Sequence, residues 1–409
     1  MSGPYAAMGI PDFRLFISAR FCITLAIQIQ AVVVGWQVYE ITRDPLSLGL
    51  IGLAEAVPSI AVSLYAGHVA DVTSRKKIIL ITVATLVLCS GLLLFFTIDL
   101  GSFLLSYGVL PIYAVIFVSG IARGFITPAI FSFMPQLVPR ELYQNAISWN
   151  STLWEMASIG GPPIGGLIYG FFGITAAYSV DASLMILGLI LVTAVASRPV
   201  PQVSEEQGIV EKIKAGLQFV FRNKIILGAI SLDLFAVLFG GAIALLPIFA
   251  DEILGVGKIG FGVLRSAPGI GALLTALYFT YHPIRKSMGT ILLYSVAGFG
   301  VCMILFALSR NFWLSMGVLA VSGAFDCVSV IIRGTLLQTL TPENMKGRVS
   351  AVNNIFIGSS NEIGSFESGV AAKLMGVIRS VVFGGVMTLF VVATTAWKAP
   401  ELRKLQEVK

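Results

Sequence analysis

The chain has 409 residues, of which 56% are hydrophobic and only 12% are charged. This apolar content, with a mean hydropathy of +0.91, exceeds what a soluble core of this size could bury, so the composition indicates an integral membrane protein. The net charge of +6 comes from cations dispersed at the ends of apolar runs, a placement that excludes a nucleic-acid-binding stripe. Four cysteines lie inside apolar segments without paired spacing, so we expect no disulfide framework, metal site or cofactor: Cys22, Cys89, Cys302 and Cys327.

Twelve apolar segments follow one another along the chain, each long enough to cross a hydrocarbon layer of about 30 Å as a helix. Continuous apolar runs and 42 glycines favour an all-α bundle over a β-barrel, whose strands would read as short alternating segments. The first segment has no small-residue cleavage site after it, so we expect it to be a retained helix. The predicted spans are 13–39, 46–69, 78–97, 110–134, 142–169, 172–196, 225–250, 259–281, 289–308, 312–338, 348–370 and 376–397.

One long polar gap, 197–224, divides the twelve spans into six and six. It contains the amphipathic sequence EKIKAGLQFVFRNK, which predicts a short helix lying at the membrane surface. We therefore expect the following order: an N-terminal bundle over 1–196, a cytoplasmic linker over 197–224, a C-terminal bundle over 225–397 and a cytoplasmic tail over 398–409. Cytoplasmic termini are predicted because this orientation leaves few cations in the outer loops: Arg43, Lys258, Arg310, Lys373 and Arg379.

The two halves are also alike in local sequence. Aligning Pro139 with Pro342 gives an offset of 203, which pairs Asn150 with Asn353 and Gly161 with Gly364. Such a repeat predicts two pseudo-symmetric six-helix halves that face a central cavity, the architecture of a transporter that rocks one half against the other.

A charged hinge, GHVADVTSRKK, joins the second and third predicted spans. Its Gly67, Asp71, Arg75 and Lys76 resemble the cytoplasmic loop between the second and third helices of major facilitator superfamily transporters. The family loop has a basic residue directly after the Asp and a Gly three after it, where this chain has Val72 and Ser74. The resemblance implies a gate in which Asp71 accepts hydrogen bonds while Arg75 and Arg140 hold neighbouring loops. Positive-inside topology alone would explain the cations but not the Asp four residues after a Gly.

The fifth predicted span contains SIGGPPIGGLIYG, in which Gly161, Pro162, Gly165 and Gly166 form the pattern GP-x-x-GG. This pattern resembles the fifth-helix motif of drug antiporters in the superfamily, although further glycines of that motif are replaced here by Ala157 and Ser148. Gly and Pro together allow close helix approach and a kink. A generic bent packing helix is the alternative reading.

Ionisable residues inside the spans are costly where they face lipid, at roughly 2.5–3.5 kcal/mol each, so we expect them to face a cavity or one another. Glu55, Asp233 and Glu362 lie near mid-membrane and are candidates for proton coupling, which requires a carboxylate that changes protonation state as its surroundings change. A fixed ion pair with an arginine is the alternative for each. The whole set is Arg20, Glu55, Arg123, Glu155, Asp181, Asp233, Arg265, Asp326, Arg333, Glu362 and Glu367.

The stretches PRELYQNAISWNSTLWE and FIGSSNEIGSFESG resemble the enterobactin-exporter and macrolide-efflux branch of the superfamily. The resemblance implies proton-driven export of a bulky, partly apolar molecule. Aromatic and amide side chains in the spans would line its cavity or, alternatively, serve only helix packing. The cavity candidates are Arg20, Gln28, Trp36, Arg123, Trp154, Asn353 and Asn361.

These observations predict a monomeric secondary transporter of the plasma (inner) membrane that moves an amphiphilic small molecule in exchange for protons. No nucleotide-binding loop and no catalytic triad are present in the sequence, which argues against an ATP-driven pump and an enzyme. Two alternatives stay open. One is an importer or flippase of a sugar or lysophospholipid, and the other is a membrane receptor or assembly factor that carries nothing across.

Overall fold

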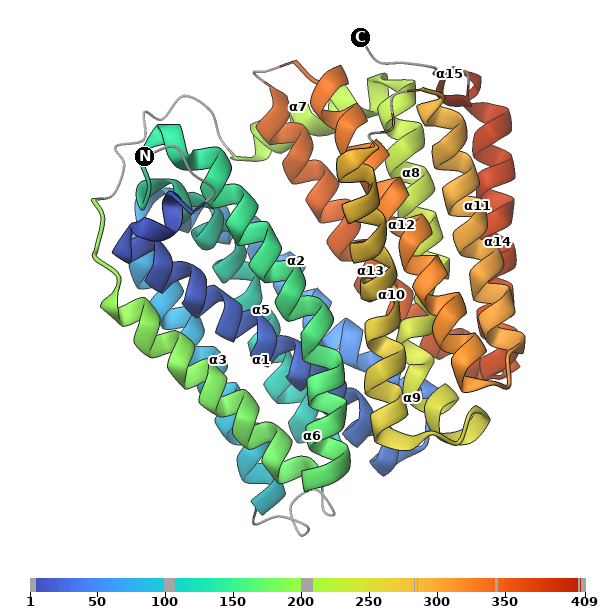
Figure 1. Cartoon of the computed structure of the whole chain (residues 1–409), viewed down its shortest axis with the longest axis horizontal. Helices are drawn as coiled ribbons and strands as arrows, with labels where there is room; N and C mark the ends of the chain where they lie inside the picture. Colours follow the sequence, from blue (N-terminus) through green and yellow to red (C-terminus); the bar gives the residue numbers. More distant parts are fainter. Residues whose placement is uncertain are drawn as a thin grey trace. The chain divides into compact units, whose positions relative to one another are not determined.

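The computed structural model describes residues 5–98, 107–199, 209–282, 284, 286–342, 345–403 and 405, with side chains at 63–64, 67–68, 70–72, 209–215, 280, 346–348, 350–351, 354–355 and 359 excepted. Within these ranges the regular structure is helical and contains no strand (Figure 1). Ten of the described segments are long and apolar enough to span a membrane. The predicted all-α membrane class is therefore confirmed.

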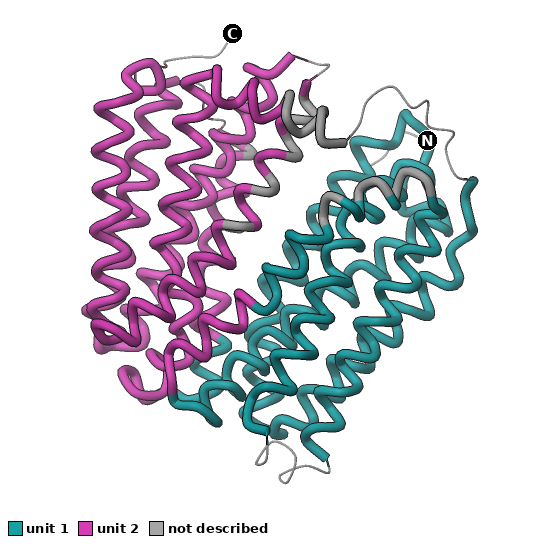
Figure 2. The backbone as a smooth tube through the Cα atoms, turned by 180° about the vertical axis from the view of Figure 1, so that it is seen from behind, with its two compact units in different colours: residues 1–43, 54–204, 257–262 teal, residues 44–53, 205–256, 263–409 magenta. Residues whose placement is uncertain are grey.

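The chain forms two compact units (Figure 2). Unit 1 comprises residues 1–43, 54–204 and 257–262. In it α1 packs along α6, and α3 packs on both α5 and α6. Its helices are α1 (Pro11–Thr42), most of α2 (Pro45–Val72), α3 (Arg75–Ile98), α5 (Leu110–Phe133) and α6 (Tyr143–Ala194).

Unit 2 comprises residues 44–53, 205–256 and 263–409. In it α11 packs on α12 and α14, while α13 packs on α7, α8 and α14. Its helices are α7 (Ile209–Arg222), α8 (Lys224–Phe239), α9 (Leu246–Ile248), most of α10 (Gly257–Tyr281), α11 (Met288–Leu308), α12 (Phe312–Leu340), α13 (Lys346–Met375), α14 (Val377–Lys398) and α15 (Pro400–Arg403).

Two glycine turns occupy matching places in the two halves of the sequence. α6 contains one non-helical residue, Gly173, with φ 84° and ψ 174°, which divides its 52 residues into two helical arms. Gly376, with φ 89° and ψ 153°, separates α13 from α14. The positions differ by 203 (376 minus 173), the offset found in the sequence. Only glycine adopts this backbone region readily, so both turns depend on the missing side chain.

The number of spans depends on how α6 and α13 are counted. α6 is one of the ten membrane-length segments found among the described residues, although Gly173 splits it, whereas α13, with 30 residues and a lower mean hydropathy, is not one of them. Counting α6 as two spans and adding α13 would give twelve. The count of twelve and the six-and-six division stay predictions.

Helix starts are fixed by local polar residues. The Asn223 side chain accepts hydrogen bonds from the backbone N–H groups of Ile225 and Ile226, both at 3.1 Å, and begins α8. Asn311 caps α12 in the same way through Leu314 N–H at 3.1 Å. An Asn side chain at this position satisfies N–H groups that have no partner within the helix.

Each unit has its own apolar interior. A buried cluster in unit 1 joins α1, α3, α5 and α6 and includes Phe13, Phe16, Leu86 and Phe133. In unit 2 the predicted surface helix corresponds to α7, whose Leu217 and Phe219 pack against a smaller cluster. Many large apolar side chains remain exposed, as expected of surfaces that face lipid: Phe131, Phe172, Leu374, Phe390 and Trp397.

Candidate transport site

An arginine–carboxylate pair lies between two membrane helices of unit 1. Arg123 of α5 donates to the Oε1 atom of Glu55 of α2 in an ion pair. The two side chains are 19% and 23% exposed, respectively. Gly120, one turn before Arg123, permits the approach, because a Cβ there would lie only 2.9 Å from the Pro58 ring. This charged pair is therefore held at a close helix crossing and stays partly open to its surroundings.

A second pair lies deeper, in unit 2. Arg333 of α12 and Asp233 of α8 form an ion pair whose side chains are only 5% and 9% exposed. Two of the three sequence-predicted coupling carboxylates, Glu55 and Asp233, are thus paired with arginines in this structure. Glu362, the third, lies on α13 and is partly buried.

Polar side chains connect α1 to both arms of α6. Gln30 donates from Nε2 to the Asp181 carboxylate at 3.2 Å, and Tyr178 donates its hydroxyl to Gln37 at 2.6 Å. Asp181 has no exposed surface. Nε2 of Gln30 also lies 3.3 Å from the hydroxyl of Ser90 in α3. These contacts fix the core of unit 1, since a buried polar group without a partner would be costly.

Further along α1, Glu40 belongs to a charged cluster that includes Lys258 in the first turn of α10. Glu40 accepts the Tyr169 hydroxyl at 2.6 Å and pairs with Lys258 at 2.9 Å. The Lys258 ammonium also lies 4.2 Å from the centre of the Tyr169 ring. Sequence reasoning did not single out Gln37, Glu40, Tyr169 or Tyr178. The spacing of residues 30, 37 and 40 along one helical face was the available signal.

The cavity candidates of unit 1 have different surroundings. Arg20 of α1 donates a hydrogen bond to Asn150 of α6, and Trp36 is buried at 3% exposure with its ring 5.6 Å from that of Phe261. Gln28 packs against Gly161, whereas Trp154 is 43% exposed.

In unit 2 the amide candidates lie on α13. Asn361 is exposed and donates from Nδ2 to the Ile357 carbonyl at 3.0 Å. Asn353 is partly buried, and its Oδ1 atom has no hydrogen-bond partner among the described residues.

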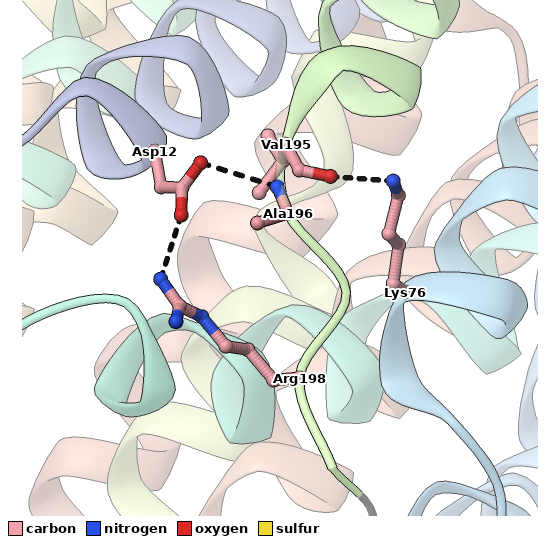
Figure 3. Close-up of polar contacts among 5 residues, drawn as sticks. All are labelled: Asp12, Lys76, Val195, Ala196 and Arg198. Atoms are coloured by element: carbon pink, nitrogen blue, oxygen red, sulfur yellow. Dashed lines mark hydrogen bonds and ion pairs between the residues drawn. The ribbon is translucent and has the colours of Figure 1, made fainter.

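Two cations of the predicted gating loop hold the ends of neighbouring helices. Arg75 donates to the Ser132 carbonyl at 3.1 Å near the end of α5. Lys76 donates to the Thr193 carbonyl at 2.9 Å. It also donates to the Val195 carbonyl at the end of α6 (Figure 3). Cations favour helix C-termini because the last carbonyls are unpaired and carry partial negative charge.

Asp12 completes this cluster from the first turn of α1. Its carboxylate accepts the Ala196 backbone N–H at 3.1 Å and pairs with Arg198 at 2.6 Å (Figure 3). Of the other loop candidates, Arg140 is exposed. Gly67 and Asp71 fall in the last turns of α2, and their side chains lie outside the described residues.

The GP-x-x-GG stretch lies in the first arm of α6 at close helix contacts. A Cβ at Gly165 would lie 3.2 Å from the Ile29 Cα, and one at Gly166 would lie 2.7 Å from the Gly262 Cα. The helix continues through Pro162, and the break in its dihedrals comes later, at Gly173. Close packing by the glycines is observed, while a functional kink at residues 161–166 stays a prediction.

Comparison with known proteins gives concordant results. A family model described as a transmembrane secretion effector matches residues 2–408. The enterobactin exporter EntS of Escherichia coli O1:K1 / APEC is 26% identical over 400 residues, covering 97% of this chain and 94% of that protein. The enterobactin exporter EntS of Shigella dysenteriae serotype 1 (strain Sd197) is 25% identical over 398 residues, with the same coverage.

Solved transporter structures share the fold. The POT family transporter PepTSo superposes with a TM-score of 0.71 at 12% identity, covering 96% of this chain and 98% of the other. The nucleoside transporter NupG superposes with a TM-score of 0.70 at 14% identity and the same coverage. At such identities the likeness establishes the arrangement of helices and says nothing of the substrate.

Proposed function

Because the chain belongs to the transmembrane secretion effector family and has the major facilitator fold, we propose that it exports a siderophore or related amphiphile by proton-coupled alternating access. The observation that carries the proposal is the likeness, over 97% of the chain, to proteins named enterobactin exporters. The chain is a multi-pass membrane transporter and not an enzyme.

Charged side chains inside the membrane-length helices support a transport pathway. Ionisable groups at this depth are costly and usually mark a substrate or ion pathway. Among the described residues, the pair Arg123–Glu55 joins two of these helices in unit 1, and the pair Arg333–Asp233 joins two in unit 2. Aromatic and amide candidates such as Trp154 and Asn361 are exposed and suit a substrate with both ring faces and hydrogen-bonding groups.

Coupling to protons requires a carboxylate whose charge changes between the two sides of the membrane. Glu55, Asp233 and Glu362 are the candidates taken from the sequence. The partly exposed ion pair of Glu55 supplies a device for coupling: when the carboxylate is protonated, Arg123 is released and becomes available to an anionic or hydrogen-bonding substrate.

We place the protein in the inner membrane as a monomer with both termini in the cytoplasm, because the outer loops then hold few cations. On that side the loop residues Gly67, Asp71, Arg75, Lys76 and Arg140 form the gate. The contacts of Arg75 with α5 and of Lys76 with α6 support this role, since they tie the ends of three helices together and would make them move as one piece.

The test is proton movement in proteoliposomes that contain the purified protein, with enterobactin as the probe. Under an imposed pH gradient, enterobactin should dissipate the gradient, and radiolabelled enterobactin should accumulate against its own gradient. Glu55→Gln, Asp233→Asn and Glu362→Gln should each be compared with Glu401→Gln, which removes an exposed charge paired with Lys224 outside the spans.

The same assay separates the alternatives. Accumulation in the opposite direction would indicate an importer. Specific binding without any accumulation would indicate a receptor, and either result would overturn proton-coupled export. If all three carboxylate variants move protons as the wild type does, the proposal of proton-coupled export stands, but the coupling proton is carried by another group.

A further inference from the structure

A small pocket opens inside unit 2 beside the buried Asp233–Arg333 pair. It is lined by α8, α11 and α12, and about 240 Å³ of empty space lies among its side chains and at its open mouth. The part of it that a water-sized molecule can occupy is only about 10 Å³, roughly the space of a single water. The pocket therefore suits an ion or a single functional group rather than a whole siderophore. The lining residues are Asp233, Ala236, Val237, Ser295, Val296, Phe299, Phe325, Asp326 and Ser329.

Asp326 brings a second carboxylate to this pocket. It lies on α12 three residues before Ser329 and seven before Arg333, positions that share one helical face. Asp233 already holds Arg333 in an ion pair. Asp326 forms no ion pair with any described residue, and it is an exposed residue that lines the pocket.

The pocket lining holds two carboxylates, and Arg333 is paired with one of them. Asp233 forms the ion pair with Arg333, whereas Asp326 has no ion-pair partner among the described residues. α10 packs on α12 where Pro268 meets Gly323, and it brings one further charged residue to this side, Arg265. The described groups that α11 brings to the pocket, Ser295, Val296 and Phe299, do not titrate. Because Asp326 is exposed, its carboxylate can exchange a proton with water, and the neutral acid has a lower cost in a membrane interior than the charged form.

Ser329 provides an independent sign of a ligand. It is 2% exposed, lines the pocket, and its hydroxyl has no hydrogen-bond partner in the described part of the chain. A hydroxyl can donate to an ionised carboxylate and can equally accept from a protonated one. One turn from Asp326, it can therefore serve both charge states of that residue, which a fixed donor could not.

We propose that Asp326 is the carboxylate that takes up and releases the coupling proton, in a pocket set by the Asp233–Arg333 pair and Ser329. The inference rests on the proposed proton-coupled export and assigns its proton site. One proton from water on the outer side forms the O–H bond of a neutral carboxylic acid, the pocket changes sides in this neutral form, and the proton returns to water on the inner side. No other bond is made or broken.

The repeat gives this assignment a structural context. The offset of 203 pairs Asp326 with Arg123 and Asp233 with Gln30. In unit 1 the matching positions thus carry a cation and an amide, and Arg123 is engaged by Glu55. The position that matches Asp326 in unit 1 thus carries no carboxylate, as expected if the two halves divide proton binding and substrate binding between them.

The test uses full-length protein in proteoliposomes with an internal pH indicator and enterobactin as the probe. Asp326→Asn should reduce enterobactin-driven proton movement to the level of empty liposomes. It should retain exchange of labelled for unlabelled enterobactin, because exchange requires no net proton release. Asp326→Glu should restore proton movement by restoring a carboxylate. Glu367→Gln, a carboxylate of α13 that accepts from Ser368 at 3.4 Å, is the matched control and should behave as wild type.

Several outcomes would overturn the assignment. Proton movement at the wild-type rate in Asp326→Asn would remove Asp326 from coupling while proton-coupled export stood. Export driven by a sodium gradient and not by protons would identify a metal cation as the ligand of the pocket and overturn both proposals.

A second measurement tests Asp326 even if the wild-type protein moves no protons with enterobactin. Infrared difference spectra of the purified protein between acid and neutral pH should contain a carboxylic-acid band that disappears in Asp326→Asn. Identical spectra for the two proteins would contradict the assignment, whichever substrate the transporter carries. Gel filtration of each variant ensures that a lost band reports the carboxylate and not loss of folding.

Discussion

The two arginine–carboxylate pairs are chemically alike but differ in their surroundings. In unit 1 the side chains of Arg123 and Glu55 keep 19% and 23% of their surface exposed, whereas in unit 2 those of Arg333 and Asp233 keep 5% and 9%. A partly exposed pair can exchange its partner for water at little cost. A buried pair cannot, because either charge left alone would lack solvation. The comparison indicates an adaptable pair in unit 1 and a fixed one in unit 2.

The largest effect is expected from breaking the buried pair. Arg333→Met leaves the Asp233 carboxylate unpaired in a closed environment, and the loss of a partner in such pairs lowers the free energy of unfolding by about 3–5 kcal/mol. The measurement is thermal unfolding of the purified protein in detergent. The double variant Asp233→Leu/Arg333→Met, which removes both charges, should recover most of the loss. If the single variant unfolds at the wild-type temperature, the pair is not buried as the structure describes.

A glycine of the same helix tests packing in unit 2 without changing charge. A Cβ at Gly323 of α12 would overlap the backbone of Pro268 in α10, whereas Gly334, also in α12, has open space around it. Gly323→Ala should therefore destabilise by about 1–3 kcal/mol through overpacking. Gly334→Ala should be neutral or slightly stabilising, because Ala favours the helix. Equal unfolding temperatures for the two variants would contradict the close α10–α12 contact.

Much of this fold follows from hydropathy. Apolar runs and their polar interruptions predicted the membrane class and most helix positions, because a membrane helix must satisfy its backbone within one continuous segment. α13 is the exception among the long helices: its polar residues, including Asn361 and Glu362, lower its hydropathy below that of an ordinary span. The sequence repeat also predicted that the two halves are alike. The structure adds the glycine turns at Gly173 and Gly376, which are separated by the same offset.

The site was less predictable, because partners in space are not neighbours in sequence. The spans alone could not tell whether Glu55 and Asp233 stood free or were paired, since that depends on which faces of α2, α5, α8 and α12 meet. Tyr169 and Tyr178 looked like ordinary aromatic residues of apolar segments, yet their hydroxyls bond to α1. Spacing identifies one face of a helix but not the helix that packs against it.

The partly exposed pair of unit 1 should contribute less to stability. Arg123→Met removes the partner of Glu55, but the remaining carboxylate keeps access to water, so we expect a loss of about 1 kcal/mol or less. Thermal unfolding measured beside Arg333→Met, at low and at high salt, checks this. A loss as large as that of Arg333→Met would show that the pair of unit 1 is as closed as the pair of unit 2, and the contrast between them would fail.

The smallest difference is expected between two lysines, one from each unit. Lys258 pairs with Glu40 at 2.9 Å and lies over the Tyr169 ring, while Lys373 has a single ion pair, with Asp44, at the same distance. The side chain of Lys373 is 51% exposed and that of Lys258 is 33% exposed. Lys373→Gln should therefore change the free energy of unfolding by a few tenths of a kcal/mol at most.

Lys258→Gln should lower the free energy of unfolding by about 0.5–1 kcal/mol more than Lys373→Gln does, because a cation–π contact is lost along with the ion pair. Tyr169→Phe keeps the ring and removes the hydroxyl bond to Glu40, so in that background Lys258→Gln should still be destabilising. If it becomes neutral there, the lysine acts through the Glu40 network alone and the ring contributes nothing.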